Sequence, residues 1–130
     1  MAQLDALGIV VTDMANTCTF YRMVGLDIPP GAEAEGHVEV ELDGGFRIMF
    51  DTVEIMQSFS EYEFPPTGTS HKMGLAVRCA LPAEVDAAYS AIVAAGYTGH
   101  LSPFDAFWGQ RYATVLDPDG NPVDLYAPLS

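Results

Sequence analysis

The feature that most constrains the fold of this chain is an internal repeat. Two short apolar runs, residues 6–11 and 72–77, each carry a glycine in the third position, Gly8 and Gly74. Each run is followed by a segment with helical spacing and then by two strand patterns around a tight turn. Because self-similarity of this kind marks repeated supersecondary units, the sequence predicts two units of one topology.

The repeat also predicts how the domain is organised. We expect a first unit with its connector over residues 1–66 and a second unit over residues 67–130. A chain of 130 residues is of the size of one domain and can bury a sizeable core. The two units are therefore expected to form one α+β domain, with a connector in residues 53–70.

The first helical segment has a clear start and a clear end. Thr12 or Asp13 is a suitable N-cap, and Gly25 can end the helix in the left-handed conformation. Apolar residues recur between them at helical spacing, which predicts a stripe packed in the core. The members of this stripe are Met14, Cys18, Tyr21 and Val24.

The second helical segment follows the same plan. Pro82 suits a first helical turn, Glu84 and Asp86 favour the positive helix N-terminus, and Gly96 marks the end. The predicted buried stripe consists of Val85, Ala88, Ile92 and Ala95.

Strand patterns follow each helix. Residues 37–42 alternate strictly between apolar and polar, which predicts a strand with one buried face. If Val38, Val40 and Leu42 face the helices, Glu39 and Glu41 face the opposite side. Turn residues separate the predicted strands at two places, 43–45 and 117–121. The remaining predicted strands are residues 46–50, 112–116 and 123–126, and each unit leaves room for one further strand after its helix.

The net charge of the chain limits the classes of molecule that it is expected to bind. The chain has 5 basic and 18 acidic residues, a formal net charge of −13, and no basic cluster. This acidity argues against nucleic acid and against anionic membranes. It favours either simple solubility or the attraction of an amine-bearing ligand. No apolar run is long enough to cross a membrane, and Cys18 and Cys79 form no metal or redox motif, so we expect a cytoplasmic protein.

These patterns together resemble the vicinal oxygen chelate superfamily, which includes glyoxalase I, extradiol dioxygenases, fosfomycin-modifying enzymes and bleomycin-resistance proteins. The resemblance rests on the two tandem units, on residues 8–14 followed by Phe20-Tyr21, and on the turn at 117–121. Residues 50–54 and 108–113 look closest to drug-sequestering proteins of the mitomycin-binding type. The resemblance implies two βαβββ units whose mixed sheet curves around a cavity, in a homodimer that is either domain-swapped or unswapped.

The resemblance also locates where a metal would bind, because enzymes of this superfamily carry a metal ligand on the first and last strand of each unit. The matching positions here are Ala6, Ile48, Lys72 and Asp124. Alanine and isoleucine cannot bind a metal, and a protonated lysine offers no lone pair. One carboxylate does not make a transition-metal site, so the sequence predicts no metal and no other cofactor. Lys72 and Asp124 could instead form an ion pair.

Aromatic residues suggest a binding surface. The sole tryptophan, Trp108, lies beside Gly109 in a segment with turn character, which suits stacking on a ligand. In the resembled mitomycin-type proteins, the positions matching His37 and Trp108 sandwich a planar drug. Phe50 stands where close relatives carry tryptophan. The complete set of predicted ligand-binding residues is His37, Glu39, Phe50, Phe104, Phe107, Trp108, Arg111 and Tyr112.

The predicted function is a metal-free antibiotic-binding protein, not an enzyme, that sequesters a polycyclic or quinone-like DNA-damaging product. Mitomycins, bleomycins and anthraquinone-fused enediynes are the candidate classes. Two alternatives remain open. The first is a metal-independent lyase or isomerase, or a glyoxalase-like enzyme with a degenerate site, because one polarised His or Glu can transfer a proton. The second is a homodimer whose cavity binds an ordinary metabolite.

Overall fold

The computed structural model describes residues 2–61, 63–64 and 73–130. The chain divides into two compact units, Met1–Phe64 and Pro65–Ser130, each with its own sheet and helices. The α+β class predicted from the sequence is confirmed. Among the described residues, no helix combines the length and the apolar character needed to span a membrane.

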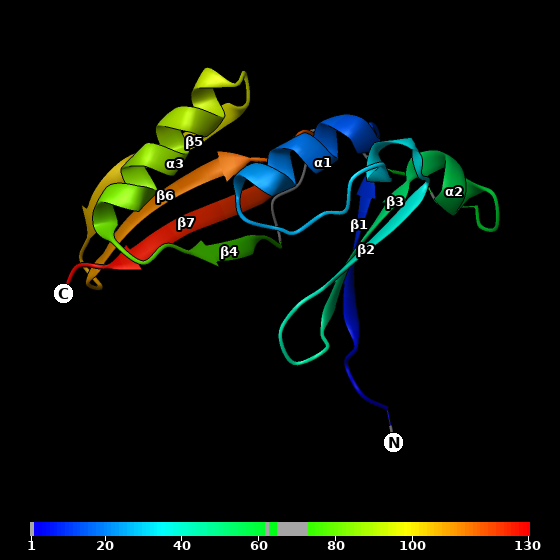
Figure 1. The fold of residues 1–130 in the computed structure, drawn as a ribbon, viewed down its shortest axis with the longest axis horizontal. Helices are drawn as coiled ribbons and strands as arrows, with labels where there is room; N and C mark the ends of the chain where they lie inside the picture. The colour runs from blue at the N-terminus through cyan, green and yellow to red at the C-terminus, as the bar shows by residue number, and fades with distance from the viewer. Residues whose placement is uncertain (1, 62, 65–72) are drawn as a thin grey trace. The chain divides into compact units, whose positions relative to one another are not determined.

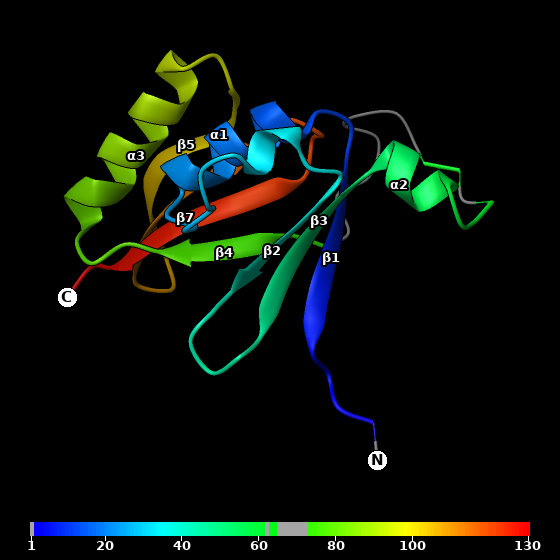
Figure 2. The ribbon, with the colours of Figure 1, turned by 45° about the vertical axis from the view of Figure 1, so that its right-hand side comes forward.

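Unit 1 is a three-stranded sheet with helices. Its sheet has the order β1-β3-β2, in which β3 is parallel to β1 and antiparallel to β2 (Figure 2). The elements of the unit are β1 (Ala6–Val11), α1 (Met14–Met23), a 3₁₀ turn (Ala32–Ala34), β2 (His37–Glu41), β3 (Arg47–Thr52) and α2 (Val53–Gln57).

Helix α1 begins and ends as its sequence predicts. The side chain of Asp13 caps the helix by accepting a hydrogen bond of 3.1 Å from the backbone N–H of Asn16. Gly25 follows the helix with φ of 99°, a conformation that only glycine adopts at low cost. The predicted stripe Met14, Cys18, Tyr21 and Val24 is buried.

The strands of unit 1 separate a core face from an open face. Val38 and Val40 of β2 are buried, and their partners on β3 are Phe50 and Ile48. The ring of Tyr21 on α1 lies 4.9 Å from that of Phe50, so this is the face covered by the helix. The opposite face, called here the open face of unit 1, carries His37, Glu39, Glu41, Arg47, Met49 and Asp51.

Unit 2 is a four-stranded sheet covered by one helix. Its sheet has the order β4-β7-β6-β5, with β4 parallel to β7 and the other pairs antiparallel. Helix α3 lies along one face of this sheet (Figure 1). The elements are β4 (Leu75–Arg78), α3 (Pro82–Ala94), β5 (Thr98–Ala106), β6 (Gln110–Leu116) and β7 (Pro122–Pro128).

The core of unit 2 lies between α3 and the sheet. Val85 and Ile92 of α3 are fully buried, as are Val115, Val123 and Leu125 of the sheet. Alternation along β6 and β7 places their remaining side chains on the other side, called here the open face of unit 2. The core stripe predicted for the helix is confirmed at Val85 and Ile92, whereas Ala88 is only half-buried and Ala95, which follows the last helical residue Ala94, is exposed.

Two expectations about the elements need correction. Residues 53–57, expected to belong to the connector, form α2, because Thr52 caps the helix by accepting a hydrogen bond from the N–H of Ile55. Residues 65–70 of that expected connector lie outside the described residues. The further strand after the helix is present in unit 2, as β5. Over the described residues of unit 1, the segment between α1 and β2 contains only the 3₁₀ turn, so that unit is βαββ.

Candidate functional site

The β5–β6 hairpin of unit 2 presents the only tryptophan of the chain. Trp108 lies in the turn between the two strands, as the sequence predicts, and its neighbour Gly109 adopts a positive φ of 93°. The indole N–H of Trp108 donates a hydrogen bond of 2.8 Å to the side-chain oxygen of Gln110. Trp108 is 49% exposed. Its ring is therefore held by a hydrogen bond while much of its surface meets solvent.

Trp108 is part of an aromatic cluster, defined here as Phe104, Phe107, Trp108 and Tyr112. Its ring centroid lies 5.0 Å from that of Phe107 and 5.3 Å from that of Tyr112, and both contacts are edge-to-face. Phe104 lies edge-on to Trp108 and to Tyr112 at 6.3 and 6.1 Å. Such geometry is favourable for aromatic pairs. The four aromatic residues predicted from the sequence are thus brought together on one hairpin.

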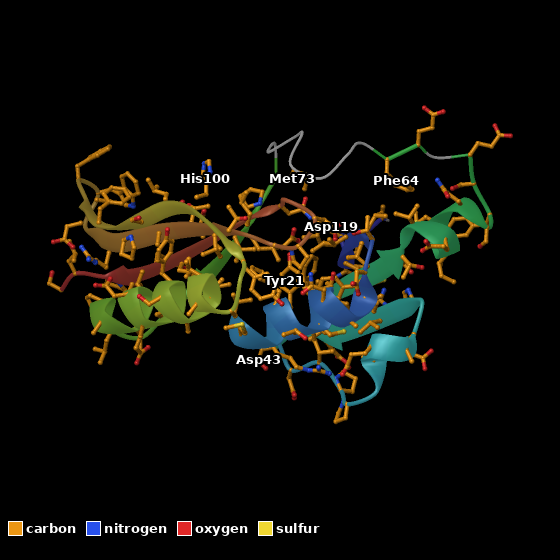
Figure 3. The ribbon with its side chains drawn as sticks, turned by 90° about the horizontal axis from the view of Figure 1, so that it is seen from above. Tyr21, Asp43, Phe64, Met73, His100 and Asp119 are labelled. Carbon is orange, nitrogen blue, oxygen red and sulfur yellow. The ribbon has the colours of Figure 1, made fainter. Side chains whose placement is uncertain are left out.

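A carboxylate network adjoins the aromatic cluster on the open face of unit 2. The hydroxyl of Tyr112 donates to Oδ2 of Asp124 at 2.5 Å, and the hydroxyl of Thr114 donates to Oδ1 at 2.8 Å. Burial, together with the hydrogen bond to Asp124, raises the pKa of Tyr112 to about 12. Tyr112 is therefore a neutral donor at physiological pH. His100 also projects on this side of the sheet, away from α3 (Figure 3).

Arg111 lies on the opposite side of β6. Its Nε and Nη2 donate to the two carboxylate oxygens of Asp86 on α3, at 2.9 and 3.0 Å, and its Nη1 donates to Asp105 at 3.1 Å. The hydrogen bond with Asp86 holds the pKa of Arg111 above its ordinary value. Strand alternation turns Arg111 toward the helix, where it links β6 to α3, whereas Tyr112 faces the other side of the sheet. The ligand contact expected for Arg111 stays a prediction.

His37 is held by two carboxylates on the open face of unit 1. Its Nδ1 lies 2.5 Å from Oδ1 of Asp51 on the facing strand, and its Nε2 lies 2.7 Å from Oε2 of Glu39. The hydrogen bond to Glu39, and next that to Asp51, raises the pKa of His37. These contacts favour the protonated ring, in which both nitrogens donate hydrogen bonds to carboxylates. The two flat faces of the ring are then the surfaces on which another group can pack.

Arg47 extends this network, and the sequence reasoning missed it. Its guanidinium donates to Glu39 and to Asp5. The pKa of Glu39 is lowered, first by the hydrogen bond from His37 and then by that from Arg47. Asp51, which was also missed, could have been found from the hairpin register, because the turn at residues 43–45 places Asp51 opposite His37.

Phe50 occupies a core position. Its ring is fully buried against Tyr21 and lies on the face of β3 opposite to Asp51 and His37. The alternation of β3 turns Phe50 toward α1 and away from His37, so the ligand contact expected for Phe50 stays a prediction. The same alternation bears out the expected facing of Val38 and Val40, whereas Leu42 follows the strand and is exposed.

The residues at the expected metal positions do not fit a metal centre. Ala6 pairs with Arg47, not with Ile48, which pairs with Leu7 and is buried. A guanidinium beside Ala6 disfavours a cation there. Asp124 already accepts two hydrogen bonds, while Lys72, with the expected Lys72–Asp124 ion pair, lies outside the described residues. Across residues 2–61, 63–64 and 73–130, no three His, Cys, Asp or Glu side chains gather as metal ligands would.

Solved structures share this fold. A glyoxalase-related enzyme from Fulvimarina pelagi is 20% identical with a TM-score of 0.78, over 98% of this chain and 88% of that one. A hypothetical protein from S. aureus is 16% identical with a TM-score of 0.77, over 98% and 94%. A glyoxalase/bleomycin resistance protein/dioxygenase family enzyme from Burkholderia phytofirmans is 24% identical with a TM-score of 0.74, over 98% and 100%.

A comparison with curated proteins finds no match. The family model for the Glyoxalase/Bleomycin resistance protein/Dioxygenase superfamily matches residues 3–125, which span both units and nearly the whole chain. Together with the order of strands and helices in the two units, this match shows that the chain belongs to the Glyoxalase/Bleomycin resistance protein/Dioxygenase superfamily.

Proposed function

We propose that this chain is an antibiotic-binding self-resistance protein. It holds a polycyclic or quinone-like DNA-damaging natural product, of the mitomycin, bleomycin or anthraquinone-fused enediyne class, and makes or breaks no bond in it. The observation that carries the proposal is the aromatic cluster, in which four rings gather on one hairpin and leave Trp108 half exposed. Exposed aromatic side chains gathered in this way mark binding surfaces.

The physical basis of binding is the removal of apolar area from water. A planar ligand stacked on the cluster gains about 25 cal/mol per Å² of apolar surface buried, and an aromatic pair adds about 0.5–1.5 kcal/mol. The hydrogen bond from Trp108 to Gln110 supports this role, because a ring held in one orientation loses little entropy when a ligand stacks on it.

His37 in unit 1 is proposed as a second stacking surface. Its two nitrogens are engaged by Asp51 and Glu39, so the ring faces remain for contact with a ligand. Glu39 and Glu41 add negative charge on the same face and favour a ligand that carries an amine. The protein is further proposed to act in the cytoplasm as a homodimer. Light scattering tests the dimer, and a stable particle of 14.0 kDa at micromolar concentration would contradict it.

The experiment that tests the proposed function is a ligand screen. Trp108 is the sole tryptophan, so its fluorescence reports binding near the aromatic cluster without a label. Purified protein is titrated with mitomycin C, bleomycin and an anthraquinone. The molecular mass of each recovered compound is then determined by mass spectrometry. The proposal expects saturable quenching by at least one compound, which is recovered with its mass unchanged. Absence of quenching and of any thermal shift across the panel would overturn it.

A second candidate function is a metal-independent lyase or isomerase. The observation that favours it is the contact of His37 Nδ1 with Asp51, because a carboxylate on one nitrogen can orient an imidazole for proton transfer. In this function the substrate takes the place of Glu39 at Nε2. The same recovered compounds decide between the two functions. A change in mass or chromatographic behaviour that disappears in His37→Gln supports the enzyme, whereas unchanged compound supports sequestration.

A further inference from the structure

Asp124 occupies a distinctive place on the open face of unit 2. It lies on β7, between Ala76 on β4 and Thr114 on β6, and its strand neighbours Val123 and Leu125 point into the core. Ala76 ends at its Cβ, so no longer side chain from β4 lies beside Asp124 at this level of the sheet. The carboxylate is therefore approachable from the side of β4.

The hydrogen bonds of Asp124 leave it able to accept more. Each of its oxygens accepts one bond from a hydroxyl, that of Tyr112 or that of Thr114. A carboxylate has about four acceptor sites, so the described residues leave two of them unused. Both hydroxyl donors come from β6, which leaves the lone pairs that face away from β6 for another partner.

Among the described residues no ion pair balances the charge of Asp124, and Arg78, on the same face of β4, lies opposite Tyr126 in the sheet. In the part of the chain that the structure describes, Asp124 takes part in none of the ion pairs, which involve His37 and the three arginines Arg22, Arg47 and Arg111. A partly buried carboxylate beside aromatic rings gains most from a donor that carries positive charge, because such hydrogen bonds are roughly twice as strong as neutral ones.

Tyr112 connects this carboxylate to the aromatic cluster. Its hydroxyl contacts Asp124, while its ring lies 5.3 Å from the ring of Trp108. Resting on the proposed function, we propose that Asp124 anchors a protonated amine of an aromatic ligand whose ring system lies against Tyr112 and Trp108. The ligand class is thus a planar aromatic compound with a short aminoalkyl arm.

Other ligand chemistries fit this carboxylate less well. An anionic group would be repelled by Asp124 and by the net charge of −13. A divalent metal would need further ligands, and within the described residues no group of three His, Cys, Asp or Glu supplies them. A neutral hydroxyl could donate to Asp124 but without the benefit of charge. A protonated amine is therefore the ligand group that Asp124 is expected to bind most favourably.

The test uses three anthraquinone probes that share one ring system and differ only in a two-carbon arm ending in an ammonium, a hydroxyl or a carboxylate. Dissociation constants are measured by Trp108 quenching at 0.15 M salt. Wild-type protein is expected to bind the ammonium probe at least about tenfold more tightly than the hydroxyl probe, the size expected for a partly desolvated charge pair. The carboxylate probe is expected to bind most weakly.

The discriminating variant is Asp124→Asn, which keeps the shape of the side chain and removes its charge. It is expected to lose the preference for the ammonium probe and to bind the hydroxyl probe within about twofold of wild type. Glu35→Gln is the matched control, because it removes one negative charge from an exposed site on unit 1 that has no proposed binding role, and it should leave the preference intact. A preference that survives Asp124→Asn, or that disappears in Glu35→Gln, would overturn the inference.

A second measurement keeps the test decisive if Asp124→Asn does not fold. Intermolecular NOEs in wild-type protein are expected between the methylene next to the ammonium and the methyl group of Thr114. Contacts of that methylene with another acidic residue instead would overturn the inference. Failure of all three probes to bind wild-type protein would instead overturn the proposed function, so the two failures are distinguishable.

Discussion

His37 and Asp51 face each other across β2 and β3, and Nδ1 of His37 lies 2.5 Å from Oδ1 of Asp51. Glu39 engages the other nitrogen at 2.7 Å. Both imidazole nitrogens can donate only when the ring is protonated. The pair therefore links the protonation of His37 to the cross-strand contact.

The first prediction concerns pH and stability. The hydrogen bonds to Glu39 and Asp51 raise the pKa of folded His37 above its unfolded value, which is about 6.5. Its stabilising contribution is therefore fully present below about pH 6.5 and is lost as pH rises through the folded pKa. Urea unfolding should show wild type more stable than His37→Asn at pH 6, with the difference shrinking by pH 9. His100→Asn, outside this network, is the control, and a difference that does not vary with pH would contradict the prediction.

The second prediction concerns Trp108. Because its ring is half exposed, Trp108→Ala should cost about 1–2 kcal/mol of unfolding free energy, less than the 3–5 kcal/mol of a fully buried ring. A planar ligand should bind at least about tenfold more weakly, since both stacking and buried area are lost. Calorimetric titration measures this effect, because the variant has no tryptophan to quench. Phe59→Ala, an exposed aromatic of unit 1, should bind normally.

The third prediction separates Phe50 from the binding surface. Phe50 is fully buried against Tyr21, so Phe50→Ala should destabilise the protein by about 3–5 kcal/mol. The milder Phe50→Leu should fold and bind a planar probe with wild-type affinity. Thermal denaturation and titration measure the two quantities. A loss of affinity in well-folded Phe50→Leu would show that this side chain does contact ligand.

The fourth prediction concerns the contact between α3 and β5. A Cβ added at Gly99 would lie 2.1 Å from the hydroxyl oxygen of Tyr89, so Gly99→Ala forces this side chain to move and should cost about 1–3 kcal/mol. The double variant Gly99→Ala with Tyr89→Ala should recover part of that cost. At Gly8 nothing lies within 4 Å of an added Cβ, so Gly8→Ala should be tolerated. Equal effects at the two glycines in chemical denaturation would refute the steric explanation.

The fifth prediction concerns metal. Ala6 and Ile48, the two positions in unit 1 at which the resemblance implies metal ligands, provide no ligand oxygen or imidazole. Elemental analysis of protein purified without added metal should find no stoichiometric Zn, Fe, Mn or Ni, and a chelator should leave probe binding unchanged. One metal per chain, removed by chelator together with binding, would contradict this expectation.

Local signals in the sequence were sufficient for most of the elements. The Asp13 cap, the glycine after α1 and the turn at residues 117–121 act over a few residues, so they can be read without knowing the fold. The aromatic cluster was found for the same reason, because Phe104, Phe107, Trp108 and Tyr112 share one hairpin. Helix α2 was missed because it has only five residues, too few for a periodic pattern.

Only the tertiary structure determined on which face of its sheet each strand side chain lies and which residues pair between strands. A shift of one residue turns a strand side chain to the other face of its sheet, and the packing of α1 and α3 determines which face is covered. That choice puts Phe50 and Arg111 on the helix sides of their sheets and leaves His37 and Asp124 on the open faces. The sequence by itself determined which elements form and where aromatic residues gather. The partners of Asp124 and His37 depended on strand pairing between distant residues, which no local pattern encodes.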